Sequence, residues 1–113
     1  MKTLTVEKPW GKFEQFTHDE ISTVKIITVN AGGSLSLQKH EGRTEFWYVI
    51  SGHPTVTLGD HVVQANPGDE LNIEKKEPHR LEAPKDMVQV LEIAHGIFDE
   101  SDITRLEDKY GRT

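Results

Sequence analysis

The sequence predicts an all-β protein built as a sandwich or a barrel. Runs of β-branched and aromatic residues recur roughly every eight to twelve positions, and turn-forming Gly, Pro, Asn and Asp residues separate them. Helical periodicity is weak along the chain. With 113 residues the chain is long enough to bury one core, so we expect a single domain over 1–113.

The first predicted strand is Ser22–Val29, which ends at the turn Asn30–Gly33. The second, Glu45–Ile50, ends at Ser51–Pro54. Later predicted strands are Thr55–Leu58, His61–Ala65, Glu70–Ile73, His79–Ala83 and Met87–Ala94. Gly59-Asp60 is the type of dipeptide that closes a tight hairpin. The tail from Ser101 predicts either a last strand or a short helical turn capped by Asp102.

Composition narrows the classes of partner. A formal net charge of −6 argues against nucleic acid or an anionic membrane as the main partner, although a local basic cluster can still bind a small phosphorylated substrate. Because the chain has no cysteine, any metal must bind His, carboxylate, amide or water ligands. No apolar run approaches the roughly 20 residues of a membrane span, and the N-terminus lacks a secretory signal. We therefore expect a cytoplasmic protein.

The stretch "LSLQKHEGRTEFWYVISG" combines polar ligand-type residues with strand formers. Gln38 and His40 share one face of a strand, Glu45 follows after a short turn, and His79 opens a later strand. If the strands close into a barrel, these four side chains can converge. Two imidazoles, a carboxylate and an amide suit a divalent transition metal such as Zn²⁺, Mn²⁺, Fe²⁺, Co²⁺ or Ni²⁺. The alternative is a barrel with a polar pocket that binds no metal.

Two further charged residues are candidates for a site. Glu92 interrupts an apolar strand on the face of Val90 and Ala94. If that face is buried, the carboxylate must be paired or functional. The alternative is that this face, with Glu92, points outward. Arg43 lies in the turn between His40 and Glu45, where it either reaches a substrate oxygen or phosphate, or pairs with surface carboxylates.

The spacing of these residues resembles the pattern of the cupin superfamily, G-x5-H-x-H-x4-E-x6-G. Gly32 and Gly52 bound the block, the ligand positions hold Gln38, His40 and Glu45, and only Gln38 replaces a His. In the second block of the pattern, Gly68 and His79 are in register. The resemblance implies a small cupin barrel, a double-stranded β-helix or jelly roll, whose metal ligands are Gln38, His40, Glu45 and His79.

Four segments look like the cupin domain of type II mannose-6-phosphate isomerases: "KPWGKFE", "LSLQKHEGRTEFWYVISG", "PHRLEAP" and "EDKYGR". That domain is often fused to a mannose-1-phosphate guanylyltransferase, and here we expect a stand-alone, homodimeric isomerase-like domain. The resemblance implies conversion of mannose 6-phosphate to fructose 6-phosphate through a cis-enediol. Glu92, or a metal-bound hydroxide, would move the proton, because a carboxylate on the metal such as Glu45 is a poor free base.

The resemblance also points to substrate-binding residues. Arg43 would be catalytic and substrate-binding, and Tyr110 and Arg112 of the tail would bind substrate, with Arg112 as a phosphate clamp or as part of a frayed terminus. Two other functions stay open: another metal-dependent cupin enzyme (a sugar isomerase, an epimerase or a dioxygenase) and a non-catalytic sugar-binding cupin. Arg43 and Arg112 lining the pocket would favour a phosphosugar.

Overall fold

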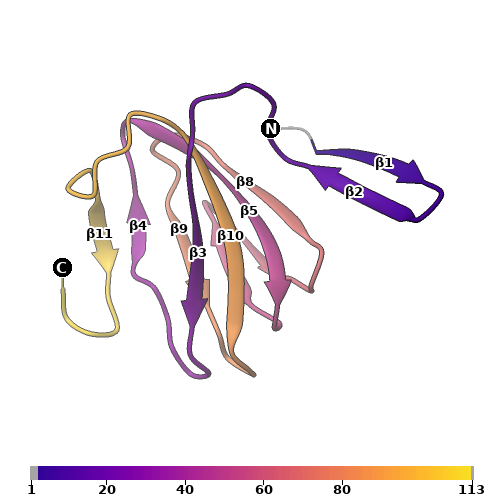
Figure 1. Cartoon of the computed structure of the whole chain (residues 1–113). Helices are drawn as coiled ribbons and strands as arrows, with labels where there is room; N and C mark the ends of the chain where they lie inside the picture. The colour runs from indigo at the N-terminus through magenta and orange to yellow at the C-terminus, as the bar shows by residue number, and fades with distance from the viewer. Residues whose placement is uncertain (1–2, 113) are drawn as a thin grey trace.

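The computed structural model describes residues 3–112, which form two antiparallel sheets and a separate hairpin (Figure 1). The four-stranded sheet has the order β3 (Thr23–Val29), β10 (Val88–Gly96), β5 (Arg43–Ser51) and β8 (Glu70–Ile73). The five-stranded sheet has the order β11 (Thr104–Glu107), β4 (Leu37–Lys39), β9 (His79–Glu82), β6 (Thr55–Leu58) and β7 (His61–Gln64). Consecutive strands often lie in different sheets, as in a jelly roll.

The hairpin of β1 (Leu4–Lys8) and β2 (Gly11–Gln15) projects away from the two sheets (Figure 1). Its strands pair with each other and with no other strand of the described chain. Phe16, just after β2, packs its ring against Phe46 and Tyr48 and so ties the hairpin to β5. Within residues 3–112 no helix is long and apolar enough to cross a membrane.

Apolar side chains fill one end of the space between the sheets. Val49, Val88 and Val90 from the four-stranded sheet and Val56 and Leu81 from the five-stranded sheet are fully buried. The alternation of each strand places these residues on the inner face. Each of these strands buries one face. Polar residues on that same inner face, beyond the apolar core, therefore also point into the space between the sheets.

Cross-strand register places the polar residues of the inner faces in two rows. In the four-stranded sheet, Glu92 of β10 lies between Lys25 of β3 and Trp47 of β5. In the five-stranded sheet, Gln38 of β4 lies between Arg105 of β11 and His79 of β9. Residues directly opposite each other on neighbouring strands are about 5 Å apart, so each row brings its side chains together.

The all-β prediction is confirmed, and the ends of the predicted strands agree with the observed ones to within two residues. The tail forms a strand, β11, rather than a helical turn. The β1–β2 hairpin was not predicted, because its side chains are mostly exposed on both faces and show no alternation. The turn assigned to Arg43 is wrong: Arg43 is the first residue of β5, only 4% exposed.

Candidate metal centre

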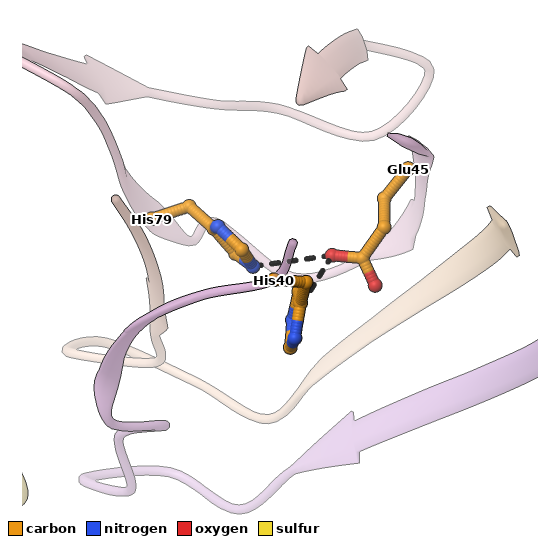
Figure 2. Close-up of side chains that lie close together, drawn as sticks. All are labelled: His40, Glu45 and His79. Atoms are coloured by element: carbon orange, nitrogen blue, oxygen red, sulfur yellow. Dashed lines mark ion pairs between the residues drawn. The ribbon is translucent and has the colours of Figure 1, made fainter. Parts of the chain in front are cut away.

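His40, Glu45 and His79 meet at the polar end of the barrel (Figure 2). His79 Nε2 lies 3.1 Å from Glu45 Oε1, and His40 Nε2 lies 3.7 Å from the same oxygen. Potential ligand atoms of all three residues lie within 4.8 Å of one another, and the three side chains are buried. Glu45 comes from β5, His79 from β9, and His40 from the turn after β4, so the two sheets build the site together.

Hydrogen bonds at the far ring nitrogens fix how the two imidazoles present themselves. His40 Nδ1 donates to the carbonyl oxygen of Asp102 at 2.7 Å, and His79 Nδ1 donates to the carbonyl oxygen of Glu77 at 2.8 Å. A carbonyl oxygen can only accept, so Nδ1 carries the proton in both rings. In a neutral ring the Nε2 atom then carries a lone pair, which points toward the other two residues of the cluster. This is the usual arrangement of a metal-ligating histidine.

The lone pairs of Glu45 Oε1 and His79 Nε2 face each other and need a positive charge between them. Glu45 Oε1 and His79 Nε2 are buried, and neither has an aligned hydrogen-bond partner although they are 3.1 Å apart. Two facing acceptors at this distance repel each other unless a proton or a metal cation lies between them. Burial also lowers the pKa of His40, which favours the neutral, ligating ring. These residues fit a divalent metal ion bound by nitrogen and oxygen.

Gln38 is positioned beside this triad. Gln38 is 8% exposed and lines a cavity together with His40 and Glu45. It lies opposite His79 in the register of β4 and β9. The structure thus brings His40, Glu45 and His79 together and places Gln38 opposite His79 on the neighbouring strand, and the role of these four residues as metal ligands stays a prediction.

Arg43 lies at the same centre. Its guanidinium donates to Glu45 Oε2 at 3.4 Å, to His40 Nε2 at 3.3 Å and to the carbonyl oxygen of Asp99 at 3.2 Å. The ring of Phe98 lies under it, with 4.3 Å from Cζ to the ring centroid. Arg43 therefore supplies a fixed positive charge next to two of the candidate ligands.

Asp102 holds the turn that carries His40. Its carboxylate accepts hydrogen bonds from the backbone N–H groups of Glu41 and Gly42, at 2.9 and 2.8 Å, while its carbonyl accepts from the His40 ring. The two backbone hydrogen bonds lower the pKa of Asp102. The sequence suggested Asp102 only as a helix cap, and its contact with a turn 60 residues away has no local signal.

Glu92 faces the inside of the barrel and is 3% exposed, so the outward alternative is not what the structure has. Trp47 Nε1–H donates to Glu92 Oε1 at 3.1 Å, and Lys25 Nζ lies 3.4 Å from Oε2. Burial, then hydrogen bonding to Glu45 and the charge of Glu45, raise the pKa of Glu92 to about 7.

Glu45 has the opposite character. Burial on its own would raise the pKa of Glu45, but in the metal-free protein the adjacent His79 and Glu92 side chains, and the positive charge that His79 and His40 carry when protonated, lower it to about 2. The cavity therefore contains one carboxylate kept ionised beside the imidazoles and one carboxyl that gains and releases a proton near neutrality. Pairs of acids whose pKa values are driven apart in this way are typical of acid–base sites.

A cavity of about 240 Å³ opens onto these residues. Arg112 reaches its wall, but the guanidinium is held by Asp108, with Nε 2.8 Å from Oδ2 and Nη2 3.0 Å from Oδ1. Tyr110 does not line this cavity; its side chain is 59% exposed and its hydroxyl accepts a hydrogen bond from the Ser34 N–H at 3.3 Å.

Two basic residues of the cavity were not identified from the sequence. Lys25 lies on the inner face of β3 with Ile27 and Val29, and a charge within that apolar alternation was a usable signal. Arg105 lies on β11, where no alternation marks the inner face.

Comparison with known proteins places this geometry in a family. The family model described as "Mannose-6-phosphate isomerase C-terminal" matches residues 1–108. The xanthan biosynthesis protein XanB of Xanthomonas campestris pv. campestris is 39% identical over 110 residues, covering 96% of this chain and 24% of that protein. The mannose-1-phosphate guanylyltransferase ManC of Salmonella typhimurium is 37% identical over 109 residues, covering 95% and 23%. This chain thus spans about a quarter of the length of these relatives.

Solved structures show the same fold. A cupin 2 domain-containing protein from Halorhodospira halophila superposes with a TM-score of 0.68 at 26% identity, over 92% of this chain and 66% of that one. The fold is therefore the cupin double-stranded β-helix that the sequence pattern predicts.

Proposed function

This chain belongs to the mannose-6-phosphate isomerase C-terminal family, and from that premise we propose that it is a metal-dependent isomerase of phosphorylated sugars. The proposed reaction converts mannose 6-phosphate to fructose 6-phosphate. The observation that carries the proposal is the buried pair of Glu45 Oε1 and His79 Nε2, which face each other at 3.1 Å without an aligned hydrogen bond. A cavity lined by several basic side chains supports a phosphorylated substrate.

His40, Glu45 and His79 would hold the metal ion, with Gln38 as a fourth ligand. When bound, a divalent ion supplies Lewis-acid stabilisation of negative charge on the substrate oxygens. The carbonyl hydrogen bonds at both Nδ1 atoms fix the rings in the ligating orientation, and metal binding would replace the Arg43 hydrogen bond at His40 Nε2.

The reaction moves one proton from C2 to C1, while the proton on O2 ends on O1. Glu92 is the group we assign to the carbon-bound proton: its carboxylate would take the proton from C2 and return it to C1. Trp47 donates a hydrogen bond to Oε1 of Glu92, which orients the carboxyl, and Lys25 forms an ion pair with Oε2 at 3.4 Å. Arg43 would donate hydrogen bonds to the O1 and O2 atoms while they carry negative charge.

The test is turnover by protein stripped with a chelator and reloaded in turn with Zn²⁺, Mn²⁺, Fe²⁺, Co²⁺ or Ni²⁺. We expect conversion of mannose 6-phosphate that requires a metal and, in heavy water, incorporation of solvent deuterium at C1 of the product. His79→Ala should abolish it, and His61→Ala, on the exposed strand β7, should not. A folded, metal-loaded protein that converts no mannose 6-phosphate would refute the isomerase and leave a sugar-binding cupin as the better proposal.

A further inference from the structure

Arg105 is a basic residue that the structure turns toward the cavity. It lies on β11 opposite Gln38, and it is partly buried while Thr104 and Leu106 on either side of it are exposed. A bulge between Arg105 and Glu107 interrupts the pairing of β11 with β4 directly after it. Bulges of this kind re-aim side chains next to sites, and here the bulge lets Arg105 face inward at the end of a short strand.

Among residues 3–112 no carboxylate forms an ion pair with Arg105. Each of the other basic residues of the cavity faces a carboxylate: Lys25 faces Glu92, Arg43 faces Glu45 and Arg112 faces Asp108. Arg105 makes no ion pair within residues 3–112, and its buried Nε–H has no hydrogen-bond partner there. A partly buried guanidinium without a partner is costly unless a ligand supplies the anion.

We propose that Arg105 binds the phosphate group of the substrate, an inference that rests on the proposed function. A guanidinium presents paired N–H donors that match two phosphate oxygens. The Nε–H of Arg105 has no partner within residues 3–112, whereas Arg112 already uses two of its nitrogens on Asp108. Arg105, Gln38 and His79 lie on three adjacent strands, so the Arg105 and His79 backbones are roughly 10 Å apart. A hexose 6-phosphate can span this distance, with C1 and C2 at the metal centre and the phosphate at Arg105.

The experiment compares the binding of mannose 6-phosphate, inorganic phosphate and unphosphorylated mannose to the metal-loaded protein by calorimetry. Arg105→Ala should weaken mannose 6-phosphate binding roughly ten- to a hundredfold and leave mannose binding unchanged. Arg105→Lys should retain part of the affinity, because it keeps the charge without the fork. Arg80→Ala is the matched control: Arg80 lies in the same sheet but pairs with Glu82 and Glu107 outside this cavity, so phosphosugar affinity should not change.

Equal affinity of wild type and Arg105→Ala for mannose 6-phosphate would overturn the inference, as would a wild type that binds mannose 6-phosphate no tighter than mannose. If Arg105→Ala does not fold, Arg105→Lys decides the matter through the same ratio of phosphosugar to mannose affinity. Arg105-dependent binding without turnover would support the inference and refute the isomerase. Turnover with an unchanged KM in Arg105→Ala would refute the inference alone.

Discussion

At the scale of single residues, the two carboxyl groups of the cavity differ because their neighbours differ. Burial alone would raise the pKa of Glu45, but its neighbours His79, Glu92 and His40 outweigh burial and lower it to about 2. Glu92 faces Glu45, an indole N–H and one lysine, and burial dominates, so the pKa of Glu92 is about 7. The same residue type therefore has two states at neutral pH, and the difference can be measured through stability.

In the metal-free protein, Glu92 should make stability fall as the pH rises. Because its folded pKa is raised from 4.5 to about 7, the folded chain holds a proton that the unfolded chain releases between these values. The unfolding free energy of the wild type should therefore drop across pH 4.5–7 relative to Glu92→Gln, by at most roughly 3 kcal/mol. Urea denaturation of both proteins in chelator checks this, and a difference that stays constant with pH would show that Glu92 does not titrate there.

The sequence identified Glu92 because a carboxylate interrupts an apolar alternation, and the same logic applied to Lys25 would have predicted its partner. Arg105 could not be predicted, since β11 is short, mostly exposed and bulged. Inward orientation there is set by pairing with β4, a contact that local pattern does not encode.

At the scale of elements, the turn that carries His40 depends on a distant segment. Asp102→Ala removes both hydrogen bonds to the Glu41 and Gly42 N–H groups and frees this turn to move. We expect divalent metal affinity to fall roughly tenfold while the protein remains folded. Asp102→Asn retains one acceptor oxygen and should fall between Asp102→Ala and wild type. Metal titrations in which all three proteins bind equally would show that Asp102 does not position His40.

The motif glycine Gly52 directly follows β5, where the chain passes close to β10. Its φ is +86°, and an added Cβ would collide with the Met87 carbonyl oxygen and approach Val88 Cα to 2.9 Å. Gly68 has a similar φ of +92° but open space around it. Gly68→Ala should therefore cost about 1–2 kcal/mol from the left-handed backbone alone.

Gly52→Ala should cost at least about 2 kcal/mol more than Gly68→Ala, because backbone must move as well. Urea unfolding of the two variants isolates the clash from the φ strain. Equal losses would mean that β5 and β10 do not approach as closely as described.

At the scale of the whole molecule, the fold class was predictable because the strands around the core bury one face and alternate. The hairpin is the exception: with little buried on either face, it carries no such pattern. The convergence of Gln38, His40, Glu45 and His79 was predictable only as a set, since each residue alone is compatible with an ordinary polar position. The homodimer stays a prediction that sedimentation velocity can test.

The hairpin should be dispensable for the barrel and its site. A variant lacking residues 1–14 keeps Phe16, whose ring lies 5.2 Å from Tyr48 and 6.0 Å from Phe46 between ring centroids. We expect it to fold and to bind metal within about twofold of the full chain, because within residues 3–112 the hairpin strands pair with no strand of either sheet. Phe16→Ala in the full chain should cost about 1–2 kcal/mol from lost apolar burial. An unfolded truncated chain would show that the hairpin contributes to the core.

The central claim is that His40, Glu45 and His79 form a metal centre. Its most direct test is a calorimetric titration of chelator-stripped protein with a divalent metal ion. The account predicts that the wild type binds one ion per chain. His40→Ala, Glu45→Gln and His79→Ala should each weaken this binding by a factor of roughly 100 or more, and His61→Ala should bind as well as the wild type. Folded wild-type protein that binds no ion, or binding that survives all three substitutions, would contradict the claim that these buried side chains form a metal centre.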